Sequence, residues 1–377
     1  MKVTFVAEPL WHRVPGGTGV VTLELLERLR AASEVEVDAV RARQISRSGA
    51  AEDGTKLAAR VDAAGIRQTL LPRPALYEAW SRSGRPDVAG KGAHLLHSPM
   101  LLAPTSSRVP VVVTLHDLAW AERPGDFPAR ARRLYQRMFD RVARDASVVL
   151  CSSRTTLAAA VAAGLPEAKA RLVPLAARRL DPTGPDRPDI AERFGLDTPF
   201  LLSVGTAEPR KNLGRLVAAY AKTGLAREGV VLALVGPVGW QMSIAELLDD
   251  LDPEVRAAVR PLGAVTDGEL AALYEQCLAF IYPSLAEGFG LPVLEALGAG
   301  AAVVTSSGTA TAEVAGEAGV LVDPASVDDI ATGIRRVVDD AALRDHLRDA
   351  AATQLAAHSW DAHMDATLAA YREVAKR

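Results

Sequence analysis

Short apolar runs alternate with longer segments of helical periodicity along most of the chain. In the first half, apolar runs of the kind that form buried parallel strands occur at Lys2–Ala7, Val35–Val40, His94–His97, Val111–Leu115 and Ser147–Cys151. Apolar residues at helical spacing predict helices at Val20–Ala31, Ala129–Arg144 and Arg154–Ala163. This alternation favours a parallel sheet covered by helices on both faces.

The alternation restarts after Leu180–Asp189, a segment whose proline and glycine content is typical of a linker. Strands are then predicted at Phe200–Val204, Val230–Val235, Val259–Leu262, Leu278–Tyr282 and Ala302–Thr305. Helices are predicted at Asn212–Lys222, Ile244–Leu251, Asp267–Gln276, Pro292–Leu297 and Val327–Val338. We therefore expect an α/β protein with two doubly wound, Rossmann-like domains facing a cleft, residues 1–180 and 190–358, with ligands beyond the carboxyl ends of the strands. Residues 359–377 resemble an amphipathic helix with Ser359 as its N-cap.

Charge divides the chain in the same place. Residues 1–180 carry 27 Lys and Arg against 17 Asp and Glu, whereas residues 181–377 carry 16 against 29. The basic half suits acidic or membrane-surface partners. Cys151 and Cys277 have no metal-like spacing, which favours buried free thiols in a reducing compartment. With no signal-peptide pattern and no run near the roughly 18 apolar residues of a membrane span, we expect a cytoplasmic protein, at most peripheral on the inner face of the membrane.

The segment LAEGFGLPVLEALGAG combines two carboxylates with a glycine-rich turn. Gly288 and Gly290 let the backbone bend and a ligand approach, and Pro292 suits the first turn of a helix. The start of that helix offers free N–H groups that favour phosphate. Glu295 lies one turn inside and suits a ribose diol, whereas Glu287, in the loop, would meet the other end of the ligand. The alternative is that both glutamates are solvated surface residues.

A second candidate lies at the end of the first strand of the second half, in SVGTAEPRKN. Gly205 lets the chain turn, and Arg210 and Lys211 then supply adjacent positive charges that could bind a diphosphate. Cations are unfavourable at a helix start, and a nearby anion would remove that conflict. The alternative is a solvated Arg-Lys pair.

In the first half, Gly16 and Gly17 belong to a loop predicted from Pro9 to Gly19, which could touch a phosphate or an acceptor. GGTGVVT lacks the G-x-G-x-x-G spacing of a dinucleotide fingerprint, although Asp38 at the end of the next strand slightly favours a dehydrogenase.

Histidines close two of the predicted strands. His116 could bond a sugar hydroxyl while Asp117 orients its ring, and His97 ends a neighbouring strand. A lone histidine is more often structural. Asp250-Leu-Asp252 resembles a metal-binding motif, but a solvated helix end is the better interpretation, and no other cluster has metal-ligand spacing.

One predicted helix carries arginines along a face that alternates with an apolar stripe. Such a helix can lie on anionic lipid or bind an acidic acceptor, and it can equally be a solvated face. The residues are Arg130, Arg133, Arg137, Arg141 and Arg144. No nucleic-acid motif is present.

Three segments together resemble the GT-B retaining glycosyltransferases of family 4: Glu208–Asn212 (EPRKN), Leu262–Leu270 (LGAVTDGEL) and Glu287–Ala296 (EGFGLPVLEA). The EPRKN version resembles mannosyltransferase-like members. Two departures are Gly298–Ala302, where members often have Ala-Cys-Gly-x-Pro, and Val173–Ala177, where Pro-Asn-Gly is frequent.

The resemblance implies roles for individual residues. Arg210 and Lys211 would bind the donor diphosphate, and Glu287 would contact the transferred sugar. The remaining donor-side groups are Gly205 at the turn, Glu295 at the ribose, Val265 at the base, the backbone of Phe289, Gly290 and Leu291, and Gly16 and Gly17 near the phosphate. His116 would contact the sugar, and Gly17, His97 and Asp117 would line the acceptor side.

It further implies a metal-independent hexosyltransferase with no cofactor. The donor would be a nucleoside-diphosphate sugar bound by the second domain, with GDP-mannose as our best guess, and the first domain would bind a glycan, lipid-linked or small-molecule acceptor. The C-terminal helix would return to the first domain. Alternatives are a nucleotide-sugar epimerase or hydrolase of the same fold, a nicotinamide-dependent dehydrogenase, and a non-catalytic sugar-nucleotide sensor.

Overall fold

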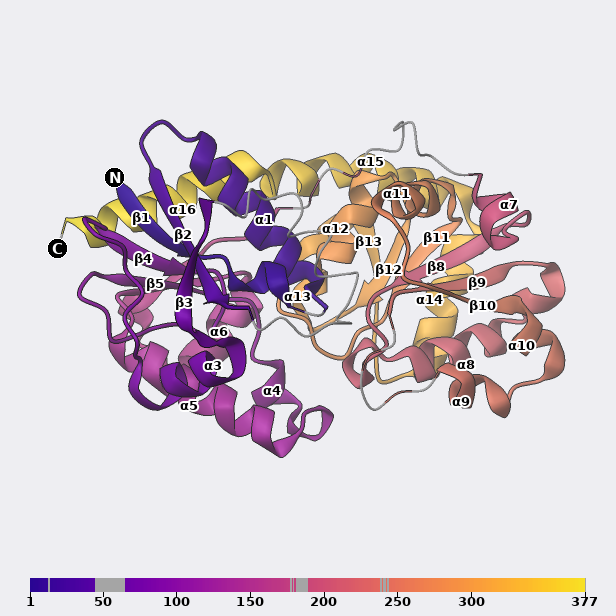
Figure 1. Cartoon of the computed structure of the whole chain (residues 1–377). Coiled ribbons are helices and arrows are strands. Elements are labelled where there is room, and N and C mark those ends of the chain that lie inside the picture. Colours follow the sequence, from indigo (N-terminus) through magenta and orange to yellow (C-terminus); the bar gives the residue numbers. More distant parts are fainter. Residues whose placement is uncertain are drawn as a thin grey trace. The chain divides into compact units, whose positions relative to one another are not determined.

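The computed structural model describes residues 1–12, 14–44, 65–176, 178, 180, 189–237, 239, 242 and 244–376 (Figure 1). The chain divides into two compact units, Met1–Arg178 together with Trp360–Arg377, and Arg179–Ser359. Most of the predicted linker lies outside the described residues.

The first unit is built on a seven-stranded parallel sheet in the order β3-β2-β1-β4-β5-β6-β7. Its strands are β1 (Lys2–Val6), β2 (Glu36–Arg43), β3 (Arg67–Pro72), β4 (Leu95–Ser98), β5 (Val111–Leu115), β6 (Val148–Cys151) and β7 (Ala170–Leu172). All residues of β4, β5 and β6 are buried, as expected for central strands covered on both faces.

Helices flank this sheet (Figure 1). They are α1 (Gly16–Ala31), α3 (Arg73–Ser83), α4 (Ala119–Glu122), α5 (Ala129–Asp145), α6 (Arg154–Ala162) and α16 (Trp360–Ala375), with short 3-10 turns η1 (Glu8–Trp11), η3 (Pro124–Asp126) and η4 (Glu167–Lys169). Helix α1 begins at Gly16, so the predicted loop to Gly19 was wrong at its end. Glycine at the exposed first turn is tolerated, and Gly16 uses a positive φ of 54° there.

The second unit has a six-stranded parallel sheet in the order β10-β9-β8-β11-β12-β13. Its strands are β8 (Phe200–Val204), β9 (Val231–Val235), β10 (Val259–Gly263), β11 (Ala279–Tyr282), β12 (Val303–Ser306) and β13 (Gly319–Val322). Its helices are α7 (Ile190–Phe194), α8 (Leu213–Thr223), α9 (Ile244–Asp249), α10 (Pro253–Ala258), α11 (Asp267–Gln276), α12 (Leu291–Gly298), α13 (Ala310–Ala315), α14 (Val327–Asp339) and α15 (Ala341–Ala357), with turns η5 (Pro209–Lys211), η6 (Leu225–Glu228) and η7 (Gly316–Ala318).

Several elements were not predicted from the apolar pattern. Strands β3, β7 and β13 lie at sheet edges, where fewer positions are buried and the apolar signal is short. Helix α15 buries only Leu347 and Ala351, so its apolar stripe is weak. Within the described residues, no helix has the length and apolar character needed to cross a membrane.

Helix α16 packs into the core of the first unit. Its Leu368, Tyr371 and Val374 are buried in one cluster with Val3 and Phe5 of β1. The Tyr371 hydroxyl lies 2.6 Å from Nδ1 of His97, whose Nε2 lies 2.9 Å from the Thr114 hydroxyl. Burial, with the nearby His363 and His116, lowers the pKa of His97 to about 3, so the ring is neutral and bonded on both sides.

We expect Tyr371→Phe to destabilise the first unit by about 1–3 kcal/mol, because it leaves a buried nitrogen of His97 without a partner. Thr367→Val is a matched control one turn earlier on α16, since the buried Thr367 hydroxyl has no hydrogen-bond partner in the described part of the chain. In urea unfolding, Tyr371→Phe should have a lower free energy of unfolding than the unsubstituted protein, and Thr367→Val should not. Equal stabilities of the two variants would contradict this account.

Candidate active site

Two glycines shape the carboxyl ends of β8 and β9. A Cβ on Gly236 would lie 2.1 Å from the carbonyl oxygen of Gly205, so the chain after β9 passes too close for any side chain. Gly205 itself has a φ of +157°, and a Cβ there would rest 3.5 Å from the side chain of Lys211. The β8 turn is therefore packed directly against the following motif, as the position of Gly205 at a strand end led us to expect.

The η5 turn presents Arg210 and Lys211 to the carboxylate of Glu287. Arg210 Nη1 donates to Glu287 Oε2 at 3.0 Å, and Lys211 Nζ donates to Glu287 Oε1 at 2.6 Å. The hydroxyl of Tyr282, at the end of β11, accepts from Lys211 Nζ and donates to Glu287 Oε1 at 2.9 Å. Arg210 Nε also donates to Glu208 Oε2 at 2.9 Å. The structure thus brings the basic pair and the first glutamate of the motif into one cluster.

The cluster is nearly closed to solvent, which controls its ionisation. The exposed fractions of the Arg210, Lys211 and Glu287 side chains are 18%, 10% and 8%. Burial opposes the charge on Glu287, yet the charges of Lys211 and Arg210 outweigh burial and lower its pKa to about 2. Burial and the neighbouring Arg210 lower the pKa of Lys211. Glu287 is therefore ionised near neutral pH.

Asn212 holds the η5 turn in place. It is the one described non-glycine residue with positive φ, at 61°, and it is 4% exposed. Its Nδ2 donates to the carbonyl oxygens of Pro283 and Pro324 at 2.9 and 2.7 Å. Asn tolerates the left-handed region, so the turn can form at this position. The two hydrogen bonds then join the turn to the loop after β11 and to the segment after β13.

Helix α12 begins immediately after this loop. Gly290 precedes it with a φ of 108°, and a Cβ there would lie 2.8 Å from Thr311 Cγ2. Among the described residues, the N–H groups of Phe289, Gly290 and Leu291 have no hydrogen-bond partner, and the helix start has no side-chain cap. Such a helix start attracts anions.

Glu295 lies one turn into α12, half-buried, and its Oε2 accepts from the Tyr274 hydroxyl at 3.3 Å. Val265 is half-buried in the connection between β10 and α11, directly before Thr266, which caps α11. Both residues thus occupy the connections that follow parallel strands, where ligands bind in such sheets.

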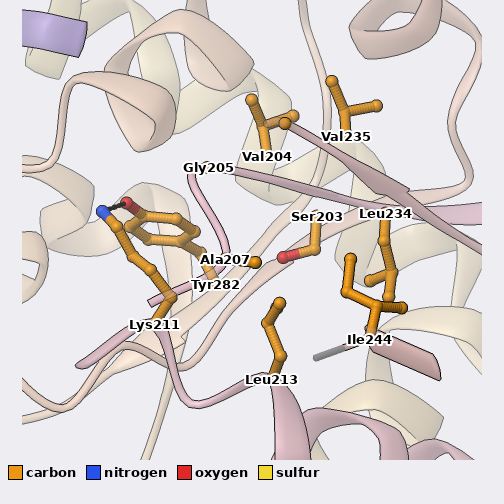
Figure 2. A pocket seen from close by; sticks show the side chains of 11 residues that line it. Ser203, Val204, Gly205, Ala207, Lys211, Leu213, Leu234, Val235, Ile244 and Tyr282 are labelled. Atoms are coloured by element: carbon orange, nitrogen blue, oxygen red, sulfur yellow. Dashed lines mark hydrogen bonds between the residues drawn. The ribbon is translucent and has the colours of Figure 1, made fainter. Parts of the chain in front are cut away.

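A hollow lies at the carboxyl ends of β8 and β9. Figure 2 shows Lys211 and Tyr282 meeting beside it, with Ser203, Leu234 and Ile244 around it. Its lining is mainly apolar, and Gly205 and Gly236 belong to it.

In the first unit, Gly16 and Gly17 form the exposed start of α1, which has no side-chain cap. His116 is half-buried after β5, and its Nε2 lies 2.8 Å from the carbonyl oxygen of Pro99. Because a carbonyl only accepts, Nε2 carries the proton. Asp117 Oδ1 accepts from the N–H of Ala119 at 3.1 Å, and the Asp117 charge acts on His116, where it opposes the burial that lowers the pKa of the ring.

His97 does not fit the acceptor-side role. Its side chain is fully buried, and both ring nitrogens are bonded to Tyr371 and Thr114. It is the penultimate residue of β4, which ends at Ser98, and its ring points into the core against α16.

The arginine face of α5 is partly used inside the protein. Arg137 Nη2 donates to Glu78 at 3.1 Å, and Arg141 donates to the carbonyl oxygens of Ser81 and Arg82 on α3. Arg144 pairs with Asp145. Arg130 and Arg133 are exposed.

Asp252 was expected at the end of the preceding helix, but α9 ends at Asp249, and Asp252 accepts from the N–H of Glu254 as the N-cap of α10. In the described ranges, no group of three or more His, Cys, Asp or Glu is arranged to hold a metal ion.

The two parallel sheets, each flanked by helices, form the GT-B fold. Residues 15–177 match the family model described as Glycosyltransferase Family 4, and residues 186–354 match Glycosyl transferases group 1. The chain belongs to this family of retaining glycosyltransferases, which transfer a sugar from a nucleotide sugar.

Relatives of known name support this placement. The chain is 28% identical to O-antigen chain mannosyltransferase B of Escherichia coli over 99% of this chain and 100% of that one. It is 30% identical to glycogen synthase of Mycobacterium tuberculosis over 77% of this chain and 69% of that one. The structure of sucrose-phosphate synthase from Thermosynechococcus elongatus superposes with a TM-score of 0.75 at 22% identity, covering 99% and 98% of the two chains.

Several site residues were not singled out from the sequence. Tyr282 reads as the end of an apolar strand, and Tyr274 as part of a helix. Asn212 and Glu208 belong to the EPRKN segment. Their positions next to Arg210 and Lys211 could have indicated that they take part in the site.

Glu287→Gln should destabilise the protein at pH 7 by about 3–5 kcal/mol, because two buried cations lose their carboxylate. Its pKa of about 2 lies below the ordinary 4.5, so this stabilisation is present above about pH 4.5 and is lost as pH falls toward 2. The difference in melting temperature from the unsubstituted protein should therefore be constant above about pH 5 and narrow as the pH falls from about 4.5 toward 3.

Glu254→Gln is the control, since its ion pair with Arg227 is solvent-exposed and contributes little. A melting-temperature difference for Glu287→Gln that stays constant or widens from pH 4.5 toward pH 3 would show that the carboxylate is not stabilised as described.

Proposed function

We propose that the protein is a metal-independent mannosyltransferase that uses GDP-mannose and transfers mannose, with retention, to a glycan, lipid-linked or small-molecule acceptor. The observation that carries the proposal is the cluster of Arg210, Lys211 and Glu287 beside the uncapped start of α12. Mannose is favoured because the relative that aligns over 99% of this chain is named a mannosyltransferase.

In this proposal the donor diphosphate lies between the η5 turn and the start of α12. Arg210 and Lys211 stabilise the charge that develops on the diphosphate as its bond to the sugar breaks. The N–H groups of Phe289, Gly290 and Leu291 bind phosphate or sugar oxygens.

Glu295 binds the ribose, and Val265 lies by the base. Gly205 permits the turn that brings Lys211 to the diphosphate.

The ionised carboxylate of Glu287 holds the two cations and contacts the transferred sugar. It does not protonate the leaving group, so the proton of the accepting hydroxyl passes to an oxygen of the departing diphosphate. His116, with its proton fixed on Nε2, offers Nδ1 to a sugar hydroxyl. Gly16 and Gly17 approach the phosphate or the acceptor, and Asp117 lies on the acceptor side.

The protein would work in the cytoplasm. If the acceptor is lipid-linked, the exposed Arg130 and Arg133 are the residues placed to meet anionic headgroups.

The donor is tested by thermal-shift measurements with GDP, UDP, ADP, TDP and their common sugars, in the presence of EDTA. A nucleotide that binds the folded protein raises the melting temperature, and we expect a selective shift by GDP and GDP-mannose. Gly290→Ala should abolish the shift, because its Cβ would meet Thr311 and its φ of 108° strains any side chain.

Gly92→Ala serves as the control, since it removes a glycine of positive φ from a turn of the first unit with open space around it. A selective shift by UDP or ADP would show that the donor carries that nucleotide and not GDP. No shift with any nucleotide, repeated with magnesium, would refute the proposed donor site.

Arg210→Ala should lower the turnover number on the order of 10²-fold or more, as for other preorganised groups that stabilise developing charge. Lys222→Ala, an exposed cation on α8 paired with Asp328, should retain normal turnover. Near-normal turnover in a folded Arg210→Ala variant would rule out the role given to Arg210. Consumption of donor at the same rate with and without acceptor would instead indicate a hydrolase or epimerase.

A further inference from the structure

A second charged cluster lies in the first unit, at the carboxyl ends of β1 and β2. Glu8 opens the η1 turn after β1, and its side chain is 1% exposed. Its Oε1 accepts from Nε of Arg73, the first residue of α3, and its Oε2 accepts from the N–H of Ala42 at 2.6 Å. Arg41 lies beside them near the end of β2 and is 8% exposed. We call Glu8, Trp11, His12, Arg41 and Arg73 the β1–β2 corner.

Among the described residues, the corner holds more positive than negative charge. The described charged groups that act on Arg41 are Glu8 and Arg73, so two guanidinium groups share one carboxylate there. His12 does not add a charge, because burial and the neighbouring Arg73 lower its pKa to about 4. A buried charge without a counter-charge is unfavourable, which makes this corner receptive to an anion.

Some guanidinium N–H groups of Arg41 and Arg73 make no hydrogen bond to the described residues and could bind such an anion. Arg41 Nε is buried without a hydrogen-bond partner in the described part of the chain. Arg73 uses Nε for Glu8 and Nη2 for the carbonyl oxygen of Trp11, and its Nη1 contacts none of the described acceptors. The Arg73 side chain is 33% exposed, so a ligand can reach it from solvent.

The surrounding groups orient these donors. The Arg41 guanidinium lies 4.5 Å from the centre of the Trp11 ring, and Trp11 also accepts from Arg73. His12 Nε2 lies 2.7 Å from the Tyr77 hydroxyl, which places the imidazole at the same corner. Helix α3 runs for 11 residues from Arg73 and has no side-chain cap, so its first N–H groups add partial positive charge.

We propose that the β1–β2 corner binds a phosphate group carried by the acceptor. Two guanidinium groups from different elements, one of them at a helix start, suit an anion of high charge with several acceptor oxygens, such as phosphate. The corner lies just before the start of α1 at the same edge of the sheet, where Gly16 and Gly17 are exposed. The assignment to an acceptor rests on the proposed function; the anion site itself does not.

Isothermal titration calorimetry on the full chain tests the site with three probes: mannose 6-phosphate, uncharged mannose, and geranyl diphosphate as a short lipid-linked diphosphate. We expect at least one phosphate probe to bind at least tenfold tighter than mannose. Preference for mannose 6-phosphate indicates a soluble acceptor, and preference for geranyl diphosphate indicates a lipid carrier; either supports the site.

Arg41→Gln and Arg73→Gln should each weaken phosphate binding at least tenfold, whereas Arg43→Gln, an exposed neighbour on β2, should change it less than twofold. Arg73→Lys keeps the charge beside Glu8 but removes the forked guanidinium donors, so we expect it to fold and to weaken phosphate binding, which separates loss of binding from loss of folding. Phosphate probes that bind no tighter than mannose, or unchanged binding in folded Arg41→Gln and Arg73→Lys variants, would overturn the site.

The nucleotide-induced melting shift is measured on the same variants and should be unchanged. If nucleotides bind and phosphate probes do not, only the β1–β2 corner fails. If phosphate probes bind through Arg41 and Arg73 while no nucleotide binds, the anion site stands and the proposed transferase function fails.

Discussion

The carboxylate of Glu287 between two cations is the interaction on which the second unit's site depends. One buried carboxylate accepts from Arg210, Lys211 and Tyr282, and so joins the turn after β8 to the end of β11. Asn212 reinforces the same junction through two carbonyl oxygens. Because Glu287 lies only a few residues before α12, the position of that helix start follows from the ion pairs. Charge balance and backbone geometry are therefore set by the same few contacts.

Buried strands were readable from the sequence because their whole length is apolar, and β5 and β8 have the predicted bounds. The edge strands β3, β7 and β13 were not predicted, because only central strands are covered on both faces, although the edge strand β10 was. The glycines and the basic pair pointed to the correct loops, since their chemistry is local. Their mutual distances depend on tertiary contacts between residues more than 70 positions apart, which no local pattern contains.

His97 shows why a strand-end position is insufficient evidence for a role at a site. Successive side chains of a strand point to opposite faces, and the face that His97 occupies is covered by α16, 274 residues later in the chain. The arginines of α5 show a similar limit. Charge counting identified a basic half of the chain. However, Arg137 and Arg141 donate hydrogen bonds to residues of α3, so composition alone overstates the basic surface.

Helix α16 makes the first unit discontinuous in sequence. Its core includes Leu368, Tyr371 and Val374 together with residues of β1, while Arg179–Ser359 forms a unit of its own. During synthesis the second unit therefore leaves the ribosome complete, whereas the first unit waits for its last helix with part of its apolar surface uncovered.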